Sequence, residues 1–95
     1  MTDLDKVTYL RMRKAFGNGN ERRGRAIMQA IALRLEEARA KHPKFAESEV
    51  HALSVIDSEM SELKHAVYYE APGREKDEGL DVIATTVRFL GEEYK

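Results

Sequence analysis

The chain has 95 residues, a formal net charge of −1 and no cysteine. This length fits a single domain with a thin core, and the lack of cysteine excludes disulfides, thiolate metal sites and thiol nucleophiles. No apolar run is long enough to span a membrane, and the first ten residues do not resemble a signal peptide, so we expect a cytoplasmic protein.

The charge is unevenly divided along the chain. Residues 1–44 carry 11 Lys/Arg and 5 Asp/Glu, a net charge of +6, whereas residues 45–95 carry 5 Lys/Arg and 12 Asp/Glu, a net charge of −7. A basic half can bind nucleic acid or phosphates, or it can pair with the acidic half within or between subunits. We favour pairing, because the basic residues are dispersed and few aromatic residues lie among them.

The first half of the chain predicts two helices. Residues 2–16 form the first segment, and the sequence GNGN at 17–20 breaks it. The second segment covers 21–42 and ends before Pro43, since a residue that precedes proline is biased away from helical angles. Its helical periodicity predicts one apolar stripe of Ile27, Met28, Ile31, Leu35 and Ala38.

The second half predicts two more helices. One runs from about residue 46 to 69, with an apolar stripe of Ala52, Ile56, Met60, Leu63 and Val67, and the sequence APG at 71–73 ends it. The other runs from residue 74 to the C-terminus, and its apolar residues cover roughly 160–180° of the helix. This arc is wider than one packing face needs, so we expect it to pack against its own chain and a partner subunit.

No segment alternates as a strand does. The sequence therefore predicts an all-α bundle of three to four helices, with a core completed by oligomerisation. We expect a single domain over residues 1–95, with an N-terminal helix and loop at 1–20 and the core at 21–95.

Two acidic pairs border the apolar stripes of the last two helices. Glu59 and Glu62 are three residues apart, as are Glu78 and Asp81, so each pair lies on one side of its helix. Spacing alone is uninformative, because about three such pairs arise by chance in a chain of this composition. Their setting is informative: Glu59 lies about 70° and Glu62 about 120° from the centre of the apolar stripe, and Asp81 precedes Val82 and Ile83.

Like charges at the edge of a core destabilise a bundle unless something offsets them. A hard divalent cation does so, since Mg²⁺ takes oxygen ligands and keeps exchangeable waters, and four carboxylates suit two Mg²⁺ or Mn²⁺ ions. Such ions can hold a triphosphate and activate a water. The alternative is a solvated acidic face with ordinary ion pairs to Lys64, Arg88 or the basic half.

The pattern ExxE at 59–62, then 15 residues, then ExxD at 78–81 resembles the signature of the MazG-like all-α nucleotide pyrophosphohydrolases. SEMSELKHAV is similar to the first metal helix of that family, and DEGLDVIATTVRFL to the second. The resemblance covers about residues 25–95, and residues 2–16 have no counterpart.

The resemblance implies Mg²⁺-dependent hydrolysis of nucleoside triphosphates between the α and β phosphates, giving the monophosphate and pyrophosphate. Glu59, Glu62, Glu78 and Asp81 would be the metal ligands and catalytic acids, with Mn²⁺ as a possible substitute metal. It further implies a homodimer or homotetramer. Because little chain follows the second metal helix, we expect the base pocket to come from the first two helices, the partner chain or both.

Four further residues are candidates for substrate binding. Arg74 and Lys76 precede Glu78 and could contact phosphate oxygens, or they could be solvated loop charges. His65 follows Glu62 by three residues and Tyr69 lies nearer the acidic side, but a surface histidine and a packed tyrosine are the plainer interpretations. Two other functions stay open: a specialised dUTP or phosphoribosyl-ATP hydrolase, and a non-enzymatic helical module that binds partners or nucleic acid.

Overall fold

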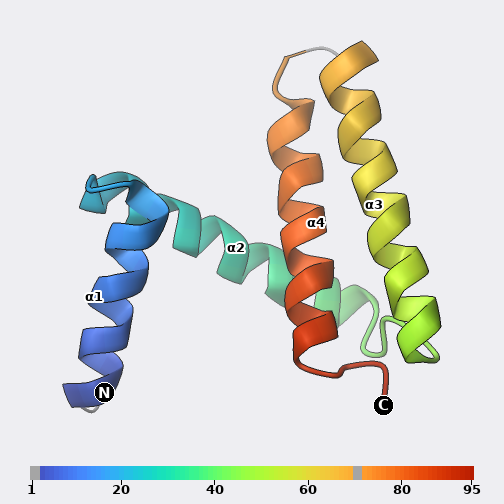
Figure 1. The fold of residues 1–95 in the computed structure, drawn as a ribbon, viewed down its shortest axis with the longest axis horizontal. Coiled ribbons are helices and arrows are strands. Elements are labelled where there is room, and N and C mark those ends of the chain that lie inside the picture. The colour runs from blue at the N-terminus through green and yellow to red at the C-terminus, as the bar shows by residue number, and fades with distance from the viewer. Residues whose placement is uncertain (1–2, 70–71) are drawn as a thin grey trace. The chain divides into compact units, whose positions relative to one another are not determined.

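The computed structural model describes residues 3–69 and 72–95. Within these residues it contains four helices and no strand: α1 (Asp3–Gly17), α2 (Glu21–Lys41), α3 (Glu49–Tyr69) and α4 (Arg74–Leu90) (Figure 1). The predicted all-α class is confirmed, and the GNGN break falls between α1 and α2 as expected. Ala71 of the predicted APG stop lies outside the described residues, whereas Gly73 of that stop has a left-handed φ of 106° directly before α4.

The contacts divide the chain into two units, Met1–Leu33 and Arg34–Lys95. The division falls inside α2. The single domain with a core beginning at residue 21 stays a prediction.

In the first unit, α1 and the start of α2 approach closely at two glycines. A Cβ atom on Gly24 would collide with the carbonyl oxygen of Arg13, and one on Gly17 would lie 2.8 Å from the Gly24 nitrogen. Asn20 caps the new helix, since its Oδ1 accepts a hydrogen bond from the Arg23 N–H at 3.1 Å. Gly24 costs helix propensity, and this close approach explains why a glycine stands there.

In the second unit, α3 and α4 lie side by side as an antiparallel hairpin (Figure 1). Small residues line the contact: Ala52 and Ala66 on α3 and Ala84 on α4 are buried. Alanines let two helix backbones approach closely, which draws longer side chains on the same faces toward one another. The packing of α3 on α4 therefore positions the acidic residues described below.

The predicted apolar stripe of α3 is partly wrong. Met60 is exposed, and 61% of Val67 is accessible to solvent. The line of α3 that faces inward instead runs through Ala52, Glu59 and Ala66 at intervals of seven residues. Small residues rather than large ones form this contact. The stripe predicted from the largest apolar side chains therefore lies to one side of the true contact.

The last helix is shorter than predicted, because α4 ends at Leu90 and residues 91–94 turn back. Glu92 has a left-handed φ of 57° in this turn. Tyr94 then packs into a small core with Ala46 and Ala52, flanked by Phe45 and Phe89, and its hydroxyl donates a hydrogen bond to Glu49 Oε2 at 3.2 Å. The third helix also begins later than expected, at Glu49 rather than residue 46.

Arg88 joins this end of the second unit together. Only 2% of the residue is exposed, and its guanidinium donates to Glu93 Oε1 at 2.9 Å and to the carbonyl oxygens of His42 and Pro43 at 2.6 and 3.1 Å. A further contact reaches the Ala38 carbonyl. None of the helices in the described part of the chain has the length and apolar character needed to cross a bilayer.

Candidate metal centre

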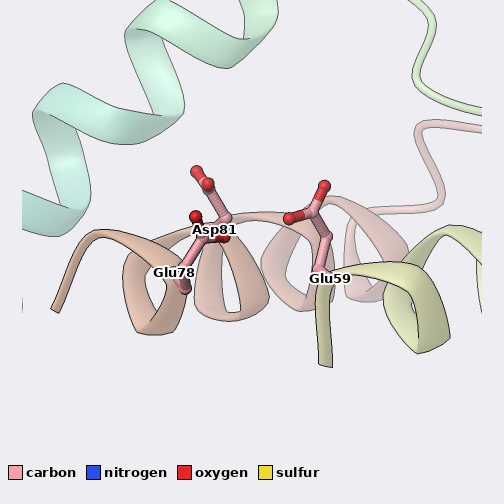
Figure 2. Close-up of side chains that lie close together, drawn as sticks. All are labelled: Glu59, Glu78 and Asp81. Carbon is pink, nitrogen blue, oxygen red and sulfur yellow. The ribbon is translucent and has the colours of Figure 1, made fainter. Parts of the chain in front are cut away.

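Three of the four predicted acidic ligands come together between α3 and α4. One carboxylate oxygen from each of Glu59, Glu78 and Asp81 lies within 4.8 Å of the others. Figure 2 shows the Glu59 side chain, from α3, beside those of Glu78 and Asp81, from α4. We call these three residues the acidic cluster.

Local sequence explains the meeting. Glu59 occupies the inward line of α3 between two buried alanines, and Glu78 and Asp81 are one helical turn apart on α4. Glu59 therefore lies nearer the centre of the buried face than the sequence predicted. The charge is part of the contact between the helices rather than a border to it.

Two oxygens of the cluster have no hydrogen-bond partner. Among the described residues, the buried side-chain polar atoms that lack a partner are Arg13 Nε, Glu59 Oε2 and Glu78 Oε2. Glu78 is only 8% exposed. Buried polar atoms are almost always paired, so these two carboxylate oxygens remain available to a proton, a water or a bound cation.

Burial and neighbouring charge alter the acidity of Glu59. Burial, followed by the negative charges of Glu62 and Asp81, raises the pKa of Glu59 from 4.5 to about 7. The carboxyl is thus held partly protonated near neutral pH while no cation is present. A divalent cation would favour the ionised form.

Two arginines already bind the cluster. Arg74 donates to Glu78 Oε1 at 2.9 Å, and Arg34, from α2, donates to Asp81 Oδ1 at 2.7 Å and to the exposed Asp77 at 3.2 Å. Burial disfavours the charged form of Arg34, but its hydrogen bond to Asp81 and the charges of Asp81, Asp77 and Glu37 outweigh this and raise its pKa. With Glu62 included, four carboxylates and two arginines leave a formal charge of −2.

The fourth predicted ligand, Glu62, is exposed and lies outside the cluster. It lines a small cavity of about 240 Å³ together with His65, Ala66, Arg74 and Glu78. Sequence reasoning proposed His65 and Arg74 for substrate binding, and both lie beside acidic residues in this cavity. Glu62 stands close enough to Glu59 for its charge to act on the Glu59 carboxyl.

The other two substrate candidates lie away from the acidic cluster. Lys76 is exposed and lines neither this cavity nor the larger one described next. Tyr69 is exposed at the end of α3, and its ring lies 5.1 Å from that of His65. Their assignment to substrate binding stays a prediction.

A larger cavity of about 430 Å³ adjoins the cluster on the side of α2. Its wall contains Glu59 and Asp81 together with side chains that the sequence analysis had not singled out: Arg34, Glu37, Lys41, His42, Phe45 and Thr85. Its volume is typical of small-molecule sites. Basic groups, acids and one aromatic ring thus face a common space.

The sequence did carry a signal for Arg34. This arginine follows Ile31 by three residues and precedes Ala38 by four, so it lies on the apolar stripe of α2. A cation on an apolar stripe requires a buried partner, and the acidic border of the last helix was the available one. Only the three-dimensional packing identifies that partner as Asp81.

The cluster fits a divalent cation of the Mg²⁺ class. Mg²⁺ binds oxygen at about 2.1 Å, so two of its ligand atoms lie no more than roughly 4.2 Å apart. Adjacent ligands of one such ion lie only about 3.0 Å apart, so the cluster oxygens, within 4.8 Å of one another, would have to move closer by up to roughly 1.8 Å as the side chains turn toward the ion. The donor set is carboxylate oxygen throughout, which suits Mg²⁺ or Mn²⁺.

Comparison of this chain with protein-family models, curated proteins and solved structures finds no match.

Proposed function

We propose that this protein is a Mg²⁺-dependent nucleotide pyrophosphohydrolase that cleaves (d)NTPs between the α and β phosphates. The observation that supports the proposal most directly is the pair of unpartnered buried oxygens, Glu59 Oε2 and Glu78 Oε2, in a three-carboxylate cluster. The ExxE and ExxD spacing that resembles the MazG-like family supports the same chemistry. Hydrolysis of triphosphates to the monophosphate and pyrophosphate would serve nucleotide-pool housecleaning.

The acidic residues and Arg74 would have different roles in this reaction, according to their positions. Glu59, Glu78 and Asp81 would hold the cation, which when bound supplies charge neutralisation for the phosphates and acidifies the attacking water. Glu62, exposed beside the cluster, would orient that water or accept its proton. Arg74, which lines the small cavity, would contact a phosphate oxygen.

A homodimer or homotetramer is part of the proposal. Leu53, Met60 and Val67 are exposed and seven residues apart, so they form one apolar line along α3. At the end of α4, 74% of Leu90 is exposed. A second copy of the chain would cover such lines, and light scattering on the purified protein measures the assembly.

The test is a panel of (d)NTPs incubated with Mg²⁺, followed by separate assays for pyrophosphate and orthophosphate. Pyrophosphate release is expected, and Glu59→Gln and Asp81→Asn should each lower turnover by more than about 100-fold, at least the cost of losing a supporting group at a metal. Including dUTP in the panel, with phosphoribosyl-ATP in a separate assay, distinguishes a broad enzyme from a specialised one.

Asp57→Asn is the matched control, because Asp57 is an exposed carboxylate on the same helix outside the cluster. Its turnover should equal that of the wild type. Release of orthophosphate alone would contradict the reaction type, and full activity in both cluster variants would contradict the site. Inactivity on every nucleotide, with salt-sensitive binding to DNA or RNA, would favour the non-enzymatic module.

A further inference from the structure

Arg34 contacts both the acidic cluster and the large cavity. Its guanidinium donates to Asp81 Oδ1 at 2.7 Å and to Asp77 Oδ1 at 3.2 Å, so it binds a cluster carboxylate directly. The same side chain lines the large cavity, where Lys41 and His42 are its basic neighbours. It can therefore reach both the cluster and the space beside it.

The two contacts of Arg34 differ in strength and in burial. Asp81 is half-buried, and its side chain is 32% exposed against 64% for Asp77. A charge-assisted hydrogen bond to a half-buried carboxylate is the stronger of the two. A cation that enters the cluster must compete with this bond, because both draw on the same carboxylate group.

An open position for a cation remains despite the two arginines. Glu78 is more than nine-tenths buried and its Oε2 has no partner, although Arg74 binds its other oxygen. Neither arginine satisfies Glu59 Oε2. Arginines thus bind two of the three cluster carboxylates, and two carboxylate oxygens stay without a partner among the described residues.

We propose that Arg34 is an exchangeable counter-cation: it neutralises Asp81 while the cluster is empty, and turns into the large cavity to bind a phosphate group once a divalent cation is bound. This inference rests on the proposed function for the identity of its anion. Arg34 needs no backbone movement for the exchange, since its side chain already lines the cavity. Its fork of donors suits phosphate as well as it suits carboxylate.

The electrostatics of the large cavity support an anion there. Three basic groups face it, from Arg34, Lys41 and Arg88, and His42 lies among them. Arg88 is committed to Glu93 and to backbone carbonyls, so Arg34 and Lys41 remain as phosphate donors. The acids that face the same space are Glu37, Glu59 and Asp81, and two of these belong to the cluster that a cation would neutralise.

The experiment measures two affinities in each variant. Mn²⁺ is titrated into the metal-free protein, and the Mn²⁺ complex of tripolyphosphate is titrated into the protein in excess Mn²⁺, both by calorimetry. Arg34→Met should bind Mn²⁺ roughly 10- to 100-fold more tightly than the wild type, the range for losing one hydrogen bond to a charged group that competes with the ion. It should bind the tripolyphosphate complex at least about tenfold more weakly.

Three variants make the result specific. Lys41→Met should weaken tripolyphosphate binding and leave Mn²⁺ binding unchanged, because Lys41 lines the cavity without an ion pair to the cluster. Arg39→Met should alter neither, since Arg39 on the same helix pairs with Glu93 instead. Arg34→Lys keeps the charge without the fork, so Mn²⁺ should bind only a few-fold more tightly, and this variant serves if Arg34→Met does not fold by circular dichroism.

The outcomes separate this inference from the proposed function. Equal Mn²⁺ affinity in the wild type and both Arg34 variants overturns the exchange but leaves the metal site standing. Weaker Mn²⁺ binding in the variants overturns it too, because Arg34 would then only hold Asp81 in place. No Mn²⁺ binding by any of these proteins overturns the metal centre and the exchange together.

Discussion

Two buried charged side chains on α4 differ in how completely they are hydrogen-bonded. Near the end of α4, Arg88 is 2% exposed and its guanidinium is bonded to Glu93 and to backbone carbonyls of the segment after α2. Near the start of α4, Glu78 is 8% exposed, yet one of its oxygens has no partner. Burial is nearly equal, and the difference lies in hydrogen bonding.

The difference separates a buried charge whose hydrogen bonds are complete from one whose hydrogen bonds are not. A buried charge that serves the fold is stabilising only when its hydrogen bonds are complete, and Arg88 meets this condition. An incomplete set costs free energy unless a proton or a ligand completes it. The beginning of α4 therefore keeps the open hydrogen-bonding capacity that the proposed metal site needs, whereas its end, which we call the structural joint, is held by a complete set of hydrogen bonds.

The largest expected effect tests the structural joint. Arg88→Met removes the guanidinium and leaves three carbonyls and Glu93 to find other partners, so we expect the free energy of unfolding to fall by about 3–5 kcal/mol. Urea unfolding followed by circular dichroism measures it.

Arg39→Met is the matched control for this change. Arg39 also bonds Glu93, but its side chain is 48% exposed, and an exposed ion pair contributes no more than about 1 kcal/mol. Equal losses in the two variants would contradict the assignment of Arg88 as a joint.

The next effect tests the cluster by pH. The pKa of Glu59 is about 7 in the folded protein against 4.5 ordinarily, so between these values the folded chain retains a proton that the unfolded chain has lost. Stability in the absence of metal must then fall as pH rises from 4.5 to 7. Relative to Glu59→Gln, the wild type should lose on the order of 2–3 kcal/mol between pH 4.5 and pH 8, measured by urea unfolding in EDTA.

Glu93 gives the opposite slope at the other end of α4. Its hydrogen bond from Arg39, opposed by burial and aided by a second bond from Arg88, lowers the pKa of Glu93. The stability it contributes is present above pH 4.5 and is lost as pH falls through its lowered pKa.

A Glu59→Gln variant whose stability has the same pH dependence as that of the wild type across the whole range would contradict the assignment of Glu59 as a buried, partly protonated acid.

Much of the fold could be predicted from the sequence, because it depends on local signals. Periodicity, the GNGN break and Pro43 located four helices to within a few residues. The seam between α3 and α4 was harder, since its alanines carry little apolar weight and Val67 and Leu90, which do, are exposed. The turn after Leu90 was missed because the apolar pattern of the helix ends there without a proline to mark it.

The candidate site was predictable in its acids and not in its cations. Glu59, Glu78 and Asp81 were selected by their setting beside the apolar stripes and by the resemblance to the MazG-like family, whereas Glu62, selected with them, lies outside the cluster. Arg34 lies on α2, 47 residues before its partner Asp81 in the sequence, and no local pattern fixes such a pairing. Arg88 was considered only as a surface partner for acids, whereas its carbonyl acceptors depend on how the segment after α2 folds back.

The smallest expected effect bears most directly on the comparison. Glu78→Gln keeps the shape of the side chain, and it replaces an unpartnered carboxylate oxygen with an amide that can donate toward Glu59 or Asp81. The metal-free protein should therefore gain about 1–2 kcal/mol of unfolding free energy, while Mn²⁺ affinity falls at least about tenfold. Stability in EDTA and Mn²⁺ calorimetry measure the two effects. A variant that loses stability and metal affinity together would place Glu78 with Arg88 as a structural charge, whereas opposite signs are the signature of a residue whose hydrogen bonds are left open for a ligand.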